Sequence, residues 1–224
     1  MFQSWRYLTF LHWRYRPDDI RPLLPKTVTL DTFDDAAWVG LTPFLLKGLR
    51  PPFAPALPWI SRFPEMNVRT YVRGPDGEPG IWFFTLEADR LLAVAGARLS
   101  YRLPYRWADM HVTPGKATVE YSSTRKRPFG SGSAGIRIEI GEPIEATELD
   151  RFLTARFRLY TLFRRRLGFA QIEHEPWRLR TARVLSLAQD VIERSGVPRP
   201  SGEPMAHYTP GVDVRVERPK LTPK

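Results

Sequence analysis

Polar residues that could act on a small molecule alternate with apolar ones in the stretch 63–73. Because side chains alternate along a strand, one face of a strand here would carry Glu65, Asn67, Arg69 and Tyr71. A guanidinium group can hold a carboxylate through two parallel hydrogen bonds, and a partly buried glutamate can act as a general acid or base. We expect this face to look into the protein and not into bulk water, so that these side chains can bond one another or a shared ligand. A surface ladder of charged side chains is the alternative interpretation.

Other kinds of chemistry find little support in the residue types. The chain has no cysteine, which excludes disulfides, thiolate zinc sites and a cysteine nucleophile. None of its four histidines is followed by another at helical or strand spacing; they are His12, His111, His174 and His207. No Gly-x-Ser-x-Gly elbow, dinucleotide-binding motif or P-loop occurs. We therefore expect neither a metal site nor a cofactor.

The charge balance is strongly basic, with 34 lysines and arginines against 24 aspartates and glutamates and a net charge of +10 over 224 residues. Such an excess can indicate nucleic acid or an anionic surface. Here the arginines are scattered, and many alternate with apolar residues inside expected strands. We therefore expect no nucleic-acid partner. No apolar run approaches membrane-spanning length, which predicts a cytoplasmic protein without a membrane partner.

The pattern around the candidate residues is mostly that of strands. A hairpin is expected over 65–87, turning at Gly74-Pro75-Asp76-Gly77. Further strands are expected at 5–13, 27–32, 37–46, 108–112, 117–123, 135–140, 178–187 and 211–217. The return strand 80–87 is apolar on both faces, as in a strand between a barrel interior and a covering layer. The fold class is mostly β, in the α+β class, and residues 1–224 form a single domain.

Three helices are expected beside these strands. A short helix opens at Pro17, and another covers 189–195. The longest is expected over 148–167, with a capping box at its start and Gly168 as its C-cap. Arg156 falls on the apolar stripe of this helix, where an ionised group needs a partner. The run Arg164-Arg165-Arg166 would suit the negative end of the helix dipole.

Two loops have distinctive compositions. Residues 50–64 are rich in proline but too apolar for a solvated linker, so we interpret them as a loop packed over a barrel mouth, or a lid. The triplet Arg125-Lys126-Arg127 precedes a Gly/Ser tract. It is interpreted as a solvated hairpin end, with a phosphate contact as the alternative.

Short motifs in a fixed order give the chain a resemblance to a known family. They are Leu23-Leu24-Pro25, Asp31-Thr32-Phe33, Val39-Gly40-Leu41-Thr42-Pro43-Phe44, Phe63-Pro64-Glu65, Asn67-Val68-Arg69-Thr70-Tyr71-Val72, Gly96-Ala97-Arg98, Leu103-Pro104-Tyr105, Phe152-Leu153-Thr154, Arg158-Leu159-Tyr160-Thr161 and His174-Glu175-Pro176-Trp177. Over nearly its whole length the chain resembles the YqjF-like family of uncharacterised bacterial proteins. That family is related to the acetoacetate decarboxylase-like fold. The resemblance implies a closed antiparallel β-barrel with a few flanking helices and a central pocket.

The resemblance also bears on mechanism. Glu65 stands where the decarboxylases place a glutamate, but Tyr105 and Arg106 stand where their Schiff-base lysine and its neighbour would be. No lysine lies between Lys47 and Lys116. Imine formation needs an amine of lowered pKa, which neither tyrosine nor arginine supplies. Decarboxylation of acetoacetate through an imine is therefore not expected.

The resemblance and the residue types together define a candidate site. Glu65 and Tyr105 are the candidate catalytic residues. The candidate ligand-binding residues are Asn67, Arg69, Tyr71, Arg98, Arg156 and His174. The ligand would be a small organic acid, bound with or without acid/base chemistry. The alternatives are a buried ion network in a filled barrel and a ligand sensor without catalysis. Related barrels assemble into oligomers, so a homo-oligomer is also considered.

Overall fold

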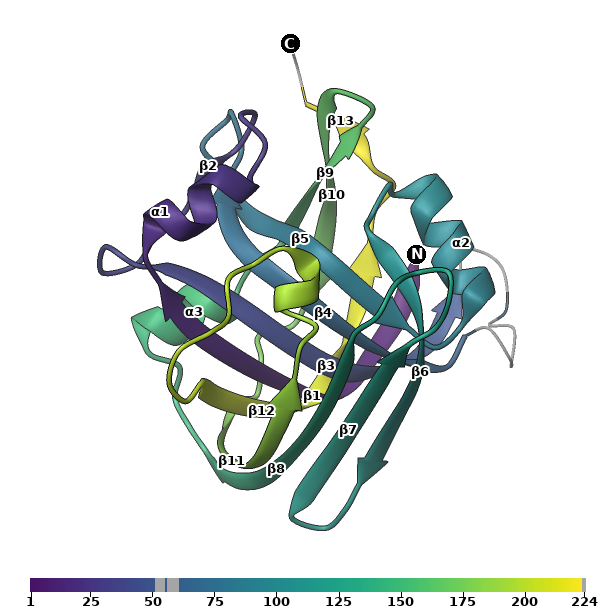
Figure 1. Cartoon of the computed structure of the whole chain (residues 1–224), viewed down its shortest axis with the longest axis vertical. Helices are drawn as coiled ribbons and strands as arrows, with labels where there is room; N and C mark the ends of the chain where they lie inside the picture. Colours follow the sequence, from purple (N-terminus) through teal and green to yellow (C-terminus); the bar gives the residue numbers. More distant parts are fainter. Residues whose placement is uncertain (51–54, 56–60, 223–224) are drawn as a thin grey trace.

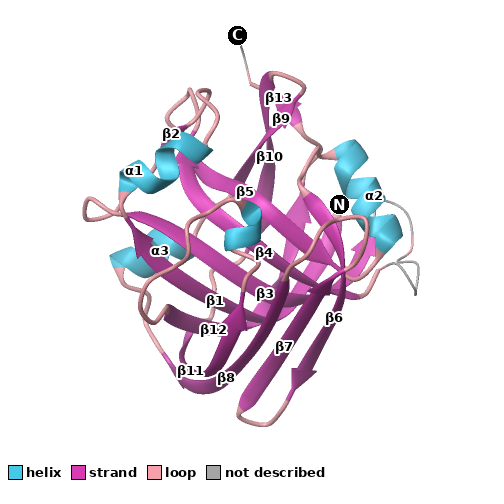
Figure 2. Ribbon diagram, viewed as in Figure 1, coloured by secondary structure: helices cyan, strands magenta, loops and turns pink. Residues whose placement is uncertain are grey.

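The computed structural model describes residues 1–50, 55 and 61–222, as long strands with short helices at the periphery (Figure 1). The strands are β1 (Phe2–Tyr15), β2 (Thr29–Leu30), β3 (Ala37–Arg50), β4 (Phe63–Arg73), β5 (Pro79–Ala88), β6 (Tyr105–Pro114), β7 (Thr118–Arg125), β8 (Ser133–Pro143), β9 (Arg158–Phe163), β10 (Arg166–His174), β11 (Arg180–Gln189), β12 (Met205–Val216) and β13 (Lys220–Leu221). The helices are α1 (Pro17–Ile20), α2 (Leu91–Ser100) and α3 (Glu148–Thr154). The mostly β class is confirmed, as Figure 2 shows. Most of the expected lid, residues 51–54 and 56–60, lies outside the described residues.

Backbone pairing joins the strands into one sheet of thirteen. The order β5–β4–β3–β1–β12 runs through its middle. Two paths lead from β12 back to β5. One passes through β10 and β9, and the other passes through β11, β8, β7 and β6. The strands β12, β1, β3, β4 and β5 are therefore shared by both rings of pairings.

The expectation of a purely antiparallel sheet is wrong at β5. This strand pairs in parallel with β9 through Ile81 and Trp82, and in parallel with β6 through 86–88. Parallel neighbours need a crossover connection, which the antiparallel expectation left out. Helix α2 supplies the crossover from β5 to β6, in a small-residue segment to which the sequence patterns assign no helix.

The shared strands have two different faces. On one face, Met66 and Val68 of β4 pack into the main hydrophobic core with Leu41 of β3 and Ile138 of β8. This core lies inside the ring that contains β6, β7, β8 and β11. Glu65 alternates with Met66 and lines a cavity on the other face. The alternation expected for this strand therefore places its polar row in a cavity.

The expected helix over 148–167 is wrong beyond Thr154. Its capping box is present, because the Thr147 side chain accepts a hydrogen bond from the Asp150 amide and the Asp150 carboxylate accepts one from the Thr147 amide. After one short helix the chain forms the hairpin β9–β10, and β9 pairs with β5. The spacing of the apolar residues in 158–172 fits both a helix and a strand. The pairing of β9 with β5 is what favours the strand.

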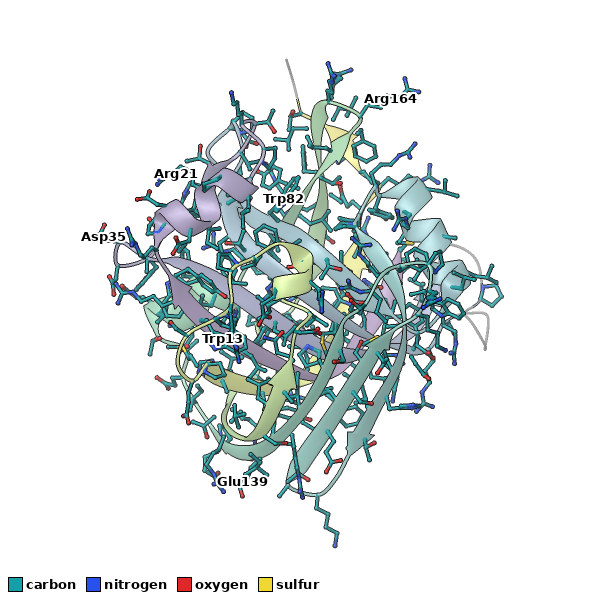
Figure 3. All side chains as sticks on the ribbon, in the orientation of Figure 1. Trp13, Arg21, Asp35, Trp82, Glu139 and Arg164 are labelled. Atoms are coloured by element: carbon teal, nitrogen blue, oxygen red, sulfur yellow. The ribbon has the colours of Figure 1, made fainter. Side chains whose placement is uncertain are left out.

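The arginine run therefore begins in the turn between β9 and β10 and ends at Arg166, the first residue of β10, and not at a helix end. Arg164 has a φ of +59° between β9 and β10, and Figure 3 shows it at the projecting end of this hairpin. Gly168 is likewise a strand residue and not a C-cap. A Cβ at that position would lie 2.7 Å from the Phe163 side chain, so glycine permits the close approach of the two strands.

Shorter predictions have mixed outcomes. The helix at Pro17 is confirmed, and the terminal strand buries Val212, Val214 and Val216. The helix expected over 189–195 is only a single 3-10 turn, Glu193–Ser195. Among the described residues, no helix is long and apolar enough to cross a membrane.

Candidate functional site

A cavity of about 110 Å³ lies against the polar face of β4. Aromatic and aliphatic side chains make up most of its wall. Polar side chains enter the wall from several elements; they are Gln3, Thr42, Glu65, Asn67, Arg69, Tyr105, Thr154, Arg156 and His174. The volume is below the roughly 300–1,000 Å³ of pockets that take drug-sized ligands, so a small metabolite fits it best.

The structure brings together six of the eight residues named from sequence. Glu65, Asn67 and Arg69 come from alternate positions of β4 and line the cavity, as the strand pattern predicts. The other three reach it from separate elements; they are Tyr105, Arg156 and His174. Their roles in binding or catalysis stay predictions.

The expected pocket position of Arg98 is wrong. Arg98 belongs to α2, is exposed, and donates a hydrogen bond to the Tyr105 carbonyl at 2.7 Å. Its guanidinium carbon lies 5.5 Å from the centre of the Phe129 ring. Helix α2 contributes Ala93 and Ala97 to the cavity wall, whereas Arg98 is not part of that wall.

Tyr71 also lies outside the cavity wall, although it is fully buried. Its hydroxyl lies 2.6 Å from His12 Nε2 and donates to the Leu153 carbonyl at 2.7 Å. Its ring packs beside the guanidinium groups of Arg69 and Arg156. Tyr71 therefore supports the two arginines from behind instead of meeting a ligand.

Glu65 and Tyr105 form one end of the polar wall. The Tyr105 hydroxyl donates to Glu65 Oε2 at 2.9 Å. Burial raises the pKa of Glu65 from 4.5 to about 8, against the opposing effect of the Tyr105 hydrogen bond. Burial, followed by the neighbouring Glu65, holds the pKa of Tyr105 well above its ordinary value. At neutral pH both side chains are uncharged, so Glu65 can donate a proton or a hydrogen bond.

Arg69 is a buried cation at another part of the wall. It is 6% exposed and donates from Nη2 to the Leu153 carbonyl at 3.2 Å. Its guanidinium carbon lies 5.2 Å from the centre of the Phe10 ring. Its Nε is buried without a hydrogen-bond partner, and no described carboxylate lies within ion-pair distance.

Arg156 shows the opposite arrangement. The expected need for a partner is met by Asp31, whose Oδ2 accepts from Nη1 of Arg156 at 2.8 Å. Nε of Arg156 donates to the Phe152 carbonyl at 2.6 Å. Burial lowers the pKa of Arg156, and Asp31 opposes this effect. Its charge is thus balanced inside the protein.

His174 contributes an aromatic and polar group to the cavity wall. Its Nδ1 lies 2.7 Å from the Glu175 carbonyl, which can only accept, so Nδ1 carries a proton. Burial lowers the pKa of His174, which makes the neutral ring with an unprotonated Nε2 the main form at neutral pH. Its ring lies 4.6 Å from that of Trp177.

Thr42 and Trp5 are among the cavity residues that were missed from the sequence. Thr42 of β3 pairs with Asn67 of β4, and both Thr42 Oγ1 and Asn67 Oδ1 are buried without a partner among the described residues. The indole nitrogen of Trp5, which also lines the cavity, is likewise buried without a hydrogen-bond partner among the described residues. The signal for Thr42 is its place between Gly40 and Phe44 on one strand face, which can be recognised only once β3 is paired with β4.

The basic triplet has a structural role at its first residue. Arg125 is buried, and its guanidinium pairs with Glu87 through Nη2–Oε1 at 2.5 Å and Nε–Oε2 at 3.1 Å. The interpretation of the whole triplet as a solvated hairpin end is therefore wrong at Arg125. Within the described ranges, no cluster of three metal-ligating side chains occurs, and none of the cavity-lining residues is a lysine.

Solved structures of similar shape support the fold. MppR, an enduracididine biosynthesis enzyme solved with pyruvate, matches with a TM-score of 0.69 and 12% identity, over 98% of this chain and 89% of that one. Acetoacetate decarboxylase from Legionella pneumophila matches with a TM-score of 0.68 and 14% identity, over 100% and 88% of the two chains. An acetoacetate decarboxylase-like enzyme from Sphingomonas wittichii RW1 matches with a TM-score of 0.70 and 11% identity, over 99% and 92%. At these identities the likeness establishes the fold alone.

Two sequence comparisons concern the family. The model of the DUF2071 family, described as an uncharacterized conserved protein, matches residues 2–213. The uncharacterized protein YqjF of Bacillus subtilis (strain 168) is 38% identical over 216 residues, which cover 96% of this chain and 89% of YqjF.

Proposed function

The chain belongs to the DUF2071 family, and from that premise we propose that it binds a small organic acid in the cavity beside β4. The ligand's carboxylate would pair with Arg69. The second polar end of the ligand would meet Glu65 and Tyr105, which are the candidate groups for proton transfer. The site works without imine chemistry, because no described cavity residue supplies an amine.

One observation carries this proposal: Arg69 is the buried arginine that lacks a counter-ion. Three arginines are buried among the described residues, namely Arg69, Arg125 and Arg156. Arg125 pairs with Glu87 and Arg156 pairs with Asp31. A buried charge without a partner is costly, and a carboxylate is the ligand group whose geometry matches a guanidinium. A bound organic acid would supply the missing charge.

The unpartnered polar atoms near Arg69 support the same conclusion. Thr42, Asn67 and Arg69 each line the cavity and each has a buried polar atom without a described partner. Because buried polar groups in folded proteins are nearly always hydrogen-bonded, such a concentration favours the binding of a polar ligand or ordered water at this place. These side chains offer a hydroxyl, an amide oxygen and a guanidinium nitrogen, which suit a carboxylate with an attached polar group.

Glu65 defines what chemistry the site could perform. With a pKa of about 8, it is protonated at neutral pH and is poised to donate to a carbonyl oxygen. Among the described residues, its only side-chain hydrogen-bond partner is the Tyr105 hydroxyl. The pyruvate bound to MppR is an organic acid with a carbonyl beside its carboxylate. We extend that ligand class to this chain, with Glu65 placed to meet the carbonyl.

The proposal includes a closed barrel around this cavity. The ring β5–β4–β3–β1–β12–β10–β9 contributes most of the cavity wall, and its pairings return to β5. A barrel of this kind excludes bulk water and thereby strengthens the attraction between Arg69 and a carboxylate.

Binding can be tested with acetate, pyruvate, acetoacetate and benzoate, each compared with its uncharged amide by thermal shift and calorimetry. At least one carboxylate is expected to raise the melting temperature of the wild type while its amide does not. Arg69→Met should abolish this shift, and Arg183→Met, which removes an exposed ion pair with Glu139, should retain it. Absence of binding by all four acids, or a shift that survives Arg69→Met, would contradict the proposal.

A further inference from the structure

A chain of buried hydrogen bonds runs behind the cavity from β1 to Arg69. The first link joins His12 Nε2 to the Tyr71 hydroxyl at 2.6 Å. The second runs from the Tyr71 hydroxyl to the Leu153 carbonyl at 2.7 Å. The same carbonyl accepts from Nη2 of Arg69 at 3.2 Å. The acceptor at the centre of this chain is therefore shared by Tyr71 and Arg69.

The donors and acceptors in this chain can be assigned from the chemistry of its members. The Leu153 carbonyl has no proton, so the single hydroxyl proton of Tyr71 goes to it. The Tyr71 oxygen must then accept, and His12 must carry its proton on Nε2. Burial, followed by the nearby charge of Arg69, holds the pKa of His12 well below its ordinary value. His12 is thus a neutral donor with one defined tautomer.

The Leu153 carbonyl, which accepts the hydrogen bond from Arg69, is fixed in space because it belongs to the end of α3. The last carbonyls of a helix have no partner inside it and favour cationic donors. Here the Phe152 carbonyl accepts from Arg156, the Leu153 carbonyl from Arg69 and Tyr71, and the Thr154 carbonyl from Trp177 Nε1. The helix end and the cavity wall therefore hold each other in position.

The His12 ring is closely packed against the neighbouring strand and against Phe10. Gly40 lies opposite His12 in the pairing of β1 with β3. A Cβ on Gly40 would lie 2.9 Å from His12 Cδ2 and 3.5 Å from Arg69 Cγ. The His12 ring also stacks on Phe10, with ring centroids 5.9 Å apart and planes at 14°. Phe10 in turn faces the guanidinium of Arg69.

We propose that His12 and Tyr71 are positioning residues that fix the Arg69 guanidinium, through the Leu153 carbonyl, for binding a carboxylate. The inference rests on the proposed function for its ligand, but the immobility of Arg69 can be measured without one. Tyr71 itself does not touch the ligand. It sets the position of the carbonyl to which Arg69 is bound, and His12 sets the direction of the Tyr71 hydroxyl.

The direct test is the mobility of the Arg69 side chain, measured by ¹⁵N relaxation of its Nε–Hε group in the ligand-free protein. Wild type is expected to show an order parameter near the rigid-backbone value of about 0.85. Tyr71→Phe and His12→Leu should lower it clearly. His12→Gln, which keeps an N–H donor near the position of Nε2, should restore it. Equal order parameters in wild type and Tyr71→Phe would overturn the proposal.

Tyr121→Phe is the matched control for a merely structural effect. Tyr121 is 3% exposed on the other face of the sheet, and its hydroxyl donates to the Tyr7 carbonyl at 2.6 Å. Its removal should cost stability but leave the Arg69 order parameter unchanged. If Tyr121→Phe mobilises Arg69 as much as Tyr71→Phe does, the effect is one of general loosening and the positioning role is refuted.

Carboxylate binding separates this inference from the proposed function. With the strongest-binding acid of the four named above, Tyr71→Phe should raise the Kd roughly tenfold, as expected for the loss of about one hydrogen bond. Tyr121→Phe should leave the Kd within twofold of wild type. The two proposals can fail separately. If Tyr71→Phe mobilises Arg69 but the wild type binds none of the four acids, the positioning role is supported and the proposed function is refuted.

Discussion

Two buried glutamates on neighbouring strands have opposite surroundings. Glu87 of β5 pairs with Met66 in the register, on the face that packs into the main core. Its carboxylate accepts two hydrogen bonds from Arg125 and one from Thr85. Glu65 precedes Met66 and faces the cavity, where it accepts a hydrogen bond from the Tyr105 hydroxyl. One sheet therefore carries a neutralised ion pair on one face and an uncharged acid on the other.

The difference distinguishes structural charges from charges that are available to a ligand. On the core face, Glu87 and Arg125 neutralise each other, and little is left for another molecule to bind. On the cavity face, Glu65 and Arg69 form no ion pair with each other. Retaining an unpaired cation and a neutral acid beside a cavity reduces stability, and such a cost is common at functional sites.

The largest expected effect separates Arg125 from Arg69, two of the three buried arginines among the described residues. Arg125→Met removes one partner of a fully buried pair and leaves the Glu87 charge uncompensated, which should cost about 3–5 kcal/mol of unfolding free energy. Arg69→Met removes an unpaired charge, and the stability of the ligand-free protein should stay within about 1 kcal/mol of wild type or rise. Urea denaturation monitored by fluorescence measures both.

The double variant Glu87→Gln/Arg125→Met provides the control for that pair. Because it removes both charges, it should recover a large part of the stability lost in Arg125→Met. If Arg69→Met proves as destabilising as Arg125→Met, the two arginines are structurally equivalent, and the contrast between the faces is wrong.

The same contrast shows what the sequence could reveal. Strand alternation was sufficient to place Glu65, Asn67 and Arg69 on one face, because the period of a strand depends only on local geometry. It could not show that Arg125, in a basic triplet beside a flexible loop, would meet Glu87, which is 38 residues away. Such pairing depends on which strands become neighbours, and the parallel entry of β6 beside β5 depends on α2.

Helix and strand periods were also confused where tertiary contacts decide. The stripe through Leu149 and Leu153 was correct for α3, but its continuation through Tyr160 reflected a strand that pairs with β5. Arg98 was misplaced for a related reason: it was chosen because Gly96-Ala97-Arg98 is one of the family motifs, and a motif alone does not show that α2 carries this arginine on an exposed side. Local patterns therefore predicted the polar wall of β4 well and the elements that complete the cavity poorly.

The second expected effect is a pH dependence of the unfolding free energy, which arises from the raised pKa of Glu65. Below pH 4.5 both folded and unfolded chains hold the proton, and between pH 4.5 and about 8 only the folded chain does. Unfolding then releases a proton, so the stability of wild type should fall relative to Glu65→Gln as pH rises, by at most about 1.4 kcal/mol per pH unit. The decline should end near pH 8. Urea titrations at several pH values measure it.

Glu120→Gln serves as the control in those titrations. Glu120 is an exposed residue of β7 that pairs with Arg137, so its replacement removes a carboxylate far from the cavity and should not reproduce the decline between pH 4.5 and about 8. A flat difference between wild type and Glu65→Gln over the same range would mean that Glu65 is ionised in the folded protein. It could then no longer act as the neutral donor of the cavity.

The smallest expected effect concerns the Tyr105 hydroxyl, which donates a hydrogen bond to Glu65. The Tyr105 hydrogen bond lowers the pKa of Glu65 and so opposes the larger effect of burial. Tyr105→Phe removes this bond and should move the Glu65 titration to higher pH, since the carboxylate loses the donor that stabilises it. Carboxyl ¹³C chemical shifts of Glu65 follow the titration directly. A shift to lower pH would show that removing the hydroxyl admits water to Glu65, and that Tyr105 acts mainly by keeping this end of the cavity dry.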